Sequence, residues 1–174
     1  PDDFLELLPT ALDSMDHPSG DGPNTYVVSK ATKDAGITMA LSGLGGDELF
    51  AGYPVFTKSA QLQKQQWLNY VPRAARSGAG QLLNFLKPSI ASAKIAGILS
   101  CKEISALSAY PYYRQVLLDN QIQKILNEKN IPENRVSIIL DEFAADPNFQ
   151  KLPLLSQVSI AEMSTYMQNV LLRD

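Results

Sequence analysis

Apolar side chains recur at helical spacing along most of the chain. Near the start, Phe4, Leu8 and Leu12 share one face of a predicted helix, and a second helix is predicted over 24–36. Further helices are favoured in segments that prolines and turns separate: 55–67, 81–86, 89–99, 102–109, 112–128, 136–144 and 156–173. The pattern therefore predicts a mainly α-helical chain.

A different pattern occupies residues 37–41, which read ITMAL. The run is short, apolar and followed almost at once by glycine, which is typical of a buried strand in a parallel sheet. RVSIIL at 135–140 is a weaker strand candidate. The predicted layout is one helix–strand unit followed by a layer of helices. Because a lone strand has unpaired edges, this chain by itself is expected to form a homodimer or to aggregate.

Composition indicates a globular protein. The 174 residues are 45% hydrophobic and 19% charged, without a signal peptide or an apolar run that could cross a bilayer, which predicts a cytoplasmic protein without a membrane partner. The formal net charge of −3 and the lack of a Lys/Arg block argue against a nucleic-acid partner. A helical pattern still runs at the last residues and the chain begins without Met, so we expect a domain truncated at both ends.

The few histidine, cysteine and tryptophan residues limit the chemistry. His17 precedes a proline in a turn-rich stretch and Cys101 has no histidine near it, which argues against a metal site built from these ligands. Cys101 is interpreted as a buried structural thiol. The tyrosines at 110–113 are interpreted as core residues, and Trp67 and Tyr70 as anchors of one helix on another.

A glycine-rich stretch, LSGLGGDELFAGY at 41–53, follows the predicted strand. Its glycines allow a tight turn and a close approach between backbone and ligand. The stretch lacks both the Gly-Lys-Ser/Thr ending of a P-loop and the G-x-G-x-x-G fingerprint. In an α/β sheet, ligands bind beyond the carboxyl ends of the strands, where this turn would lie. The stretch is therefore the candidate binding site.

From the residues alone, two interpretations of Asp47 and Glu48 remain open. A carboxylate repels a phosphate by about 4 kcal/mol at ~4 Å and an effective dielectric of ~20. A divalent cation reverses that sign, and Mg²⁺ commonly takes one or two carboxylates together with substrate phosphates. Asp47 therefore suits half of a Mg²⁺–nucleotide site. Alternatively, both acids cap a helix and favour its dipole.

The stretch LSGLGGDELFAGY, preceded by DGPNTYVVSKATKDAGITMA, resembles the second signature region of the synthetase domain of glutamine-dependent asparagine synthetases. The closing YMQNVLLRD resembles a later segment of that domain. The resemblance implies that residues 1–174 are part of an α/β domain of the adenine nucleotide alpha hydrolase-like (HUP) type. It also implies an enzyme that uses ATP to adenylate a carboxylate, aspartate in the family. Ammonia from a glutaminase domain of the same protein then displaces AMP, giving asparagine, AMP and pyrophosphate.

The same resemblance implies roles for individual residues. Those expected to contact ATP, or to let the backbone close on it, are Ser42, Gly43, Gly45 and Gly46. For Gly45 and Gly46 a simple tight turn is the alternative. Asp47 falls on a Mg²⁺ ligand, and Glu48 is a candidate catalytic acid or, alternatively, a structural acid beside the metal.

Two departures from the family pattern bear on function. The SGG-x-DS pyrophosphate loop, which supplies a second metal-binding aspartate in the family, is absent from residues 1–174, and SGAG at 77–80 carries no acid. We therefore expect this chain alone to be inactive. Leu44 occupies a position that is often acidic in asparagine synthetases, and leucine cannot move a proton. The alternatives are an amide-forming ligase for another carboxylate and a non-catalytic helical interaction module.

Overall fold

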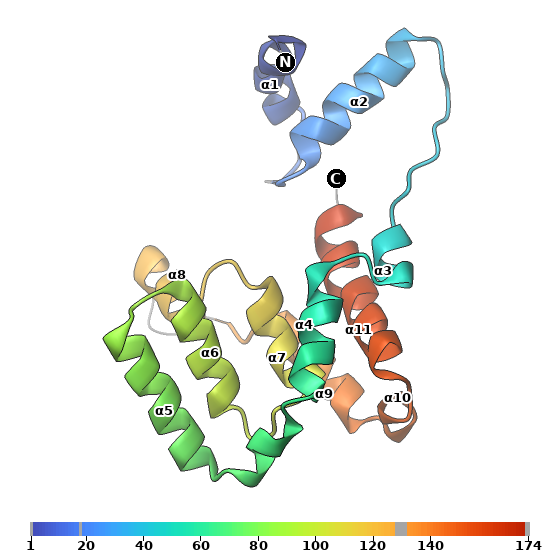
Figure 1. The fold of residues 1–174 in the computed structure, drawn as a ribbon. Coiled ribbons are helices and arrows are strands. Elements are labelled where there is room, and N and C mark those ends of the chain that lie inside the picture. The colour runs from blue at the N-terminus through green and yellow to red at the C-terminus, as the bar shows by residue number, and fades with distance from the viewer. Residues whose placement is uncertain (1, 18, 128–131, 173–174) are drawn as a thin grey trace.

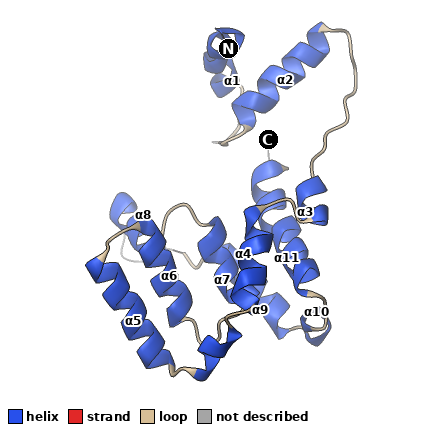
Figure 2. Cartoon of the chain, viewed as in Figure 1, coloured by secondary structure: helices blue, strands red, loops and turns tan. Residues whose placement is uncertain are grey.

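The computed structural model describes residues 2–17, 19–127 and 132–172, and shows a chain of short helices (Figure 1). The mainly α-helical prediction is confirmed, and Figure 2 shows no strand in the described part of the chain. No helix in these ranges is long and apolar enough to span a membrane.

Two helices at the N-terminal end form a separate pair. Helices α1 (Asp2–Asp13) and α2 (Gly22–Asp34) pack on each other and lie apart from the other helices in Figure 1. Ala11 of α1 is fully buried, and Met15 lies so close to Gly22 that a Cβ atom there would approach Met15 Cε to 2.8 Å. Close packing at the turn between α1 and α2 therefore holds the two helices together.

The segment that follows α2 does not form the predicted strand. Residues 37–43 run as an extended chain toward α3, and Leu41 is 97% exposed (Figure 1). A strand must pair its N–H and C=O groups with a neighbouring strand, and the described residues contain no such neighbour. The strand prediction for Ile37–Leu41 is therefore wrong here, and the HUP-type sheet stays a prediction. The second candidate, 135–140, is also wrong, because these residues belong to a helix.

The remaining elements form the body of the molecule. In order they are α3 (Gly46–Phe50), α4 (Pro54–Gln63), the 3₁₀ helix η1 (Gln66–Tyr70), α5 (Arg73–Leu86), α6 (Ile90–Ser100), α7 (Ala106–Arg114), α8 (Asp119–Leu126), α9 (Arg135–Ala145), α10 (Pro147–Gln150), α11 (Leu154–Glu162) and the π-helix η2 (Met163–Leu171). Helices α4, α7, α9 and α11 supply the main core, whose buried side chains are Val55, Phe56, Tyr110, Leu140, Val158 and Ala161. The core therefore lies next to α3, which packs on α11.

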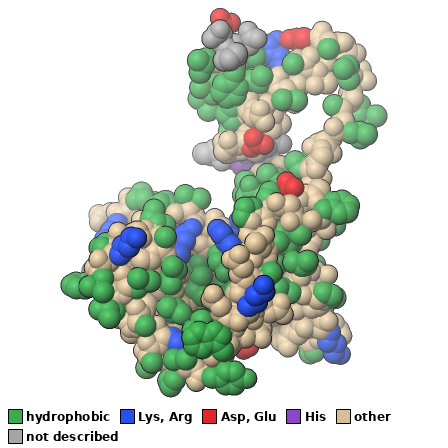
Figure 3. Space-filling view, in the orientation of Figure 1, with side chains coloured by type: hydrophobic (Ala, Val, Ile, Leu, Met, Phe, Trp, Pro, Cys, Tyr) green, Lys and Arg blue, Asp and Glu red, His purple; other side chains and the backbone are tan. Residues whose placement is uncertain are grey.

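Two local predictions are corrected in this body. Pro111 lies inside α7 rather than between two helices; a capping box between Ser105 and Ser108 starts that helix. Trp67 and Tyr70 are 60% and 91% exposed, so neither is buried between two described helices, and hydrophobic side chains lie on the surface over η1 in Figure 3. Asn69 holds η1 in place instead, because its side-chain amide exchanges two hydrogen bonds with the backbone of Ile104, at 2.8 and 2.9 Å.

Helices α5 and α6 form a tight hairpin, and the SGAG sequence lies inside α5. Gly80 faces α6 so closely that a Cβ atom there would come within 2.8 Å of the Ala96 Cα atom. Arg76 is buried in the same hairpin and donates to the carbonyl oxygens of Cys101 and Lys102, at 3.3 and 3.2 Å. Its positive charge is favourable there because these residues follow the C-terminal end of α6, where the helix dipole is negative.

The Cys101 thiol is half-buried, and burial raises its pKa, which agrees with a structural role.

The hairpin predicts opposite effects for two glycines of α5. Gly80→Ala is expected to lower the free energy of unfolding by about 1–3 kcal/mol, because the new methyl group collides with the backbone of α6. Gly78→Ala, where a Cβ atom meets nothing within 4 Å, is expected to raise it by roughly 0.5–1 kcal/mol through helix propensity alone. Urea unfolding of both variants tests the packing, and equal effects would contradict it.

Candidate functional site

The glycine-rich stretch forms a tight turn that leads into α3. The Ser42 hydroxyl accepts a hydrogen bond from the Leu44 N–H at 3.2 Å, and the Gly46 N–H donates to the Gly43 carbonyl at 3.1 Å. Gly45 has a φ of +90°, in the left-handed region, where a side chain would be strained. The predicted tight turn is therefore present, and it requires glycine at position 45.

The other glycines of the turn border open space. A Cβ atom at Gly43 or Gly46 would meet nothing within 4 Å, and one at Gly45 would only touch Met167 Sδ at 3.8 Å. Packing within the described residues therefore does not explain glycine at 43 and 46. Without side chains at these two positions, a ligand can come close to the backbone of the turn.

Asp47 lies in the first turn of α3, and its side chain is exposed. It folds over Gly52, where a Cβ atom would come within 2.0 Å of Asp47 Oδ1. The Gly52 N–H also donates to the Asp47 carbonyl at 2.9 Å, after Ala51 ends the helix with a φ of +60°. Gly52 therefore leaves the space that the Asp47 side chain occupies, a role that the sequence alone did not indicate although the residue belongs to the motif.

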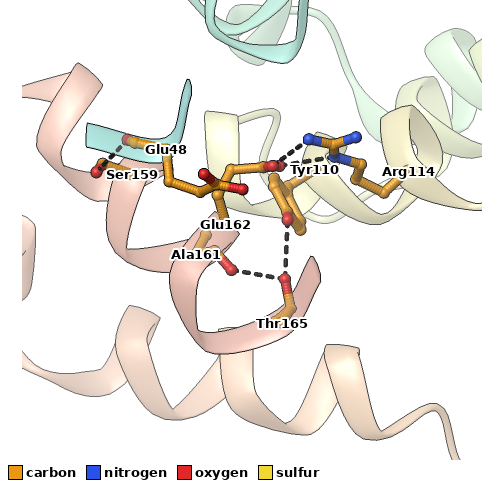
Figure 4. A network of polar contacts seen from close by, with 7 residues as sticks. All are labelled: Glu48, Tyr110, Arg114, Ser159, Ala161, Glu162 and Thr165. Carbon is orange, nitrogen blue, oxygen red and sulfur yellow. Dashed lines mark hydrogen bonds and ion pairs between the residues drawn. The ribbon is translucent and has the colours of Figure 1, made fainter. Parts of the chain in front are cut away.

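Glu48 points into the protein interior. Its side chain is only 1% exposed, and in Figure 4 it extends from α3 toward Glu162 of α11. The Glu48 carbonyl accepts a hydrogen bond of 2.6 Å from the Ser159 hydroxyl, while neither carboxylate oxygen has a hydrogen-bond donor among the described residues. The two adjacent acids of the motif are thus separated: Asp47 faces solvent and Glu48 faces the protein interior.

An ion pair in which the carboxylate is fully buried and the guanidinium is 24% exposed lies beside Glu48. Arg114 of α7 donates from Nε to Glu162 Oε1 at 2.8 Å and from Nη2 to Glu162 Oε2 (Figure 4). The guanidinium stacks over the rings of Tyr53 and Tyr166, with Cζ at 4.5 and 3.8 Å from their centroids. Glu162 has no exposed surface. This arrangement is a two-pronged, charge-assisted pair, the strongest kind of side-chain hydrogen bond.

The pair and its neighbours shift several pKa values. Burial tends to lower the pKa of Arg114, but the hydrogen bond and charge of Glu162 outweigh it and raise that pKa. Burial, with the nearby charge of Glu48, raises the pKa of Tyr53 to about 12. Burial also raises the pKa of Tyr110, whose hydroxyl lies 2.8 Å from Thr165 Oγ1. These tyrosines stay neutral at physiological pH and act as rings and hydrogen-bonding groups.

The site residues differ in how well they suit a metal ion. Within the described ranges, no three His, Cys, Asp or Glu side chains gather as a metal cluster. Asp47 alone offers an exposed carboxylate beside a bare backbone turn, which fits one protein ligand of a Mg²⁺ ion that takes its other ligands from phosphates and water. A cavity of about 190 Å³ between α7, α9 and η2 is lined by Arg114 and Tyr166 and by no residue of the turn.

The chain belongs to the asparagine synthase family, whose pattern it matches over residues 1–174. A stretch of 84 residues is 31% identical to proteins of Mycobacterium bovis and Mycobacterium tuberculosis, each named "Putative asparagine synthetase (glutamine-hydrolyzing)". That match covers 47% of this chain and 12% of each relative, so the chain matches only a small part of their length. No solved structure matches the chain.

Proposed function

We propose that the full-length protein is an ATP-dependent, amide-forming ligase of the asparagine synthetase type. The observation that carries the proposal is the exposed turn 42–46 with the exposed Asp47 carboxylate at its end, in a chain that belongs to the asparagine synthase family. The substrates would be ATP and a small carboxylate, with ammonia supplied by a glutaminase domain of the same protein.

In the first half of the reaction, an oxygen of the substrate carboxylate attacks the α-phosphorus of ATP, and the bond to pyrophosphate breaks. Ser42 and the bare backbone of the turn would hold the phosphates, and Asp47 would hold Mg²⁺. When bound, Mg²⁺ neutralises charge on the phosphate oxygens. In the second half, ammonia adds to the activated carbonyl, loses a proton and displaces AMP. The products are an amide, AMP, pyrophosphate and a proton, which is released to water, so all atoms are accounted for.

The identity of the carboxylate depends on the side chains around the turn. Leu44 places an apolar, exposed side chain in the middle of the turn, where it cannot accept a proton or bind ammonia. Aspartate is the substrate that the family resemblance implies. A less polar carboxylate is the second candidate, because an exposed leucine favours apolar contact.

Carboxylate-dependent exchange of pyrophosphate into ATP tests the proposal. We expect the full-length protein to catalyse exchange with aspartate or another small carboxylate, and residues 1–174 alone to be inactive, because they contain only one of the two expected metal-binding aspartates. Exchange by the isolated chain would show that the site is misplaced. Absence of exchange with every acid in a panel of aspartate, its homologues and apolar acids would favour the non-catalytic interaction module.

A further inference from the structure

We propose that Glu48 is a positioning residue, which sets the orientation of the Ser42–Asp47 turn through the buried Arg114–Glu162 pair. The inference rests on the proposed function, because it assigns Glu48 to the support of the Asp47 metal site. It differs from a catalytic role, in which the Glu48 carboxylate would touch substrate.

Burial is the first reason. Glu48 is 1% exposed on the inner side of α3, whereas Asp47, the neighbouring residue, is exposed on the outer side. Two consecutive residues of a helix point about 100° apart, so a helix that presents Asp47 to solvent turns Glu48 away. The Glu48 carboxylate therefore faces protein atoms rather than a ligand at the turn.

Electrostatics is the second reason. Glu48 and Glu162 are both buried, but Arg114 forms its two ionic hydrogen bonds with Glu162 alone. A buried carboxylate without a donor is unfavourable, so its position responds strongly to the nearest charges. The Glu48 carboxylate extends toward Glu162 in Figure 4. It also acts on Tyr53, whose pKa is raised by burial and by the Glu48 charge, and the Tyr53 ring lies 4.5 Å from the Arg114 Cζ atom, which links Glu48 to the ion pair.

Mechanical connection is the third reason. Helix α3 is only five residues long, and the Ser159 hydroxyl holds it to α11 through the Glu48 carbonyl, at 2.6 Å. Tyr53, three residues after the end of α3, stacks on the same Arg114 guanidinium. A change at Glu48 therefore shifts both ends of α3, and with them the Asp47 side chain that folds over Gly52.

The test is a Mg²⁺ titration of pyrophosphate exchange by the full-length protein, with thermal unfolding measured on each variant. Glu48→Gln keeps the side-chain shape and removes the charge. We expect it to raise the Mg²⁺ concentration for half-maximal activity by about 10- to 100-fold, as loss of a residue that orients a metal ligand does, without lowering Tm. Glu142→Gln, the same substitution on the exposed face of α9, is the matched control and should change neither quantity.

A second variant identifies the route. Arg114→Lys keeps the charge but loses the two-pronged geometry, so it should also raise the Mg²⁺ requirement, and the double variant should be no worse than the more affected single variant. Independent, multiplicative effects would overturn the proposal, as would a wild-type Mg²⁺ requirement in Glu48→Gln. If Glu48→Gln does not fold, Ser159→Ala is the replacement test, because it removes only the hydrogen bond to the Glu48 carbonyl. It should raise the Mg²⁺ concentration for half-maximal activity, and an unchanged concentration would overturn the proposal.

Asp47→Asn separates this proposal from the proposed function. A normal Mg²⁺ requirement in Asp47→Asn contradicts the metal role of Asp47 and therefore the function on which the positioning role rests. If Asp47→Asn raises the Mg²⁺ requirement but Glu48→Gln leaves it normal, only the positioning role of Glu48 is contradicted.

Discussion

Asp47→Asn in the full-length protein is expected to lower carboxylate-dependent pyrophosphate exchange by about 10²- to 10³-fold. A bound Mg²⁺ ion would contribute several kcal/mol of charge stabilisation in the transition state, and loss of its protein ligand would remove part of it; each ~1.4 kcal/mol is a factor of ten in rate. The free energy of unfolding should change by less than about 1 kcal/mol, because asparagine keeps the size and most of the capping ability of the exposed Asp47 side chain.

Pyrophosphate exchange across a Mg²⁺ titration and thermal unfolding, measured on the same preparation, distinguish a metal ligand from a helix cap. Asp13→Asn, the same substitution at an exposed aspartate of α1, is the control and should leave both quantities unchanged. If Asp47 only favours the helix dipole, its replacement should lower stability slightly and leave exchange intact. That result would remove the metal role from Asp47.

Arg114→Met should lower the free energy of unfolding by about 3–5 kcal/mol, the usual loss when one partner of a buried ion pair is removed. Glu162 has no exposed surface, and without Arg114 its carboxylate would be a buried charge without a cation. The double variant Arg114→Met/Glu162→Leu should recover most of the loss, because two apolar side chains of similar volume need no partner. Urea unfolding at pH 7 measures all three proteins.

An exposed ion pair provides the comparison for this experiment. Lys30 and Asp34 of α2 pair at 3.0 Å, with side chains that are 41% and 62% exposed. Lys30→Met is therefore expected to lower the free energy of unfolding far less than Arg114→Met does, because water screens an exposed pair. If Arg114→Met has no larger effect than Lys30→Met, the Arg114–Glu162 pair is not buried in solution.

The features that local sequence determines were predicted well. Helical spacing of apolar residues predicted the α-helical character, and the glycines of 41–53 predicted the tight turn, because a backbone with φ of +90° at Gly45 needs glycine whatever surrounds it. The strand at Ile37–Leu41 was predicted wrongly because a strand depends on a partner strand, which an apolar run cannot reveal. Trp67 and Tyr70 were misplaced for a similar reason, since burial depends on what packs above a side chain.

The buried part of the candidate site could not be predicted. Arg114 and Glu162 are 48 residues apart in the sequence, and nothing in the spacing of charges links them. The motif itself did not show that Asp47 faces solvent while Glu48 is buried, because both acids begin the same helix. The role of Gly52 could have been predicted locally, because a glycine that follows a short helix commonly marks a close backbone contact.

The hydrogen bond between Ser159 and the Glu48 carbonyl has a consequence for synthesis on the ribosome, because it joins residues 111 positions apart. At typical translation rates of about 5–20 residues per second, Ser159 is made roughly 6 to 22 s after Glu48. During that interval the Glu48 carboxylate faces water, where its charge is well solvated, and the glycine turn has no support behind it. A nascent chain therefore completes the scaffold of its candidate binding turn only when α11 emerges, long after the motif itself has left the ribosome.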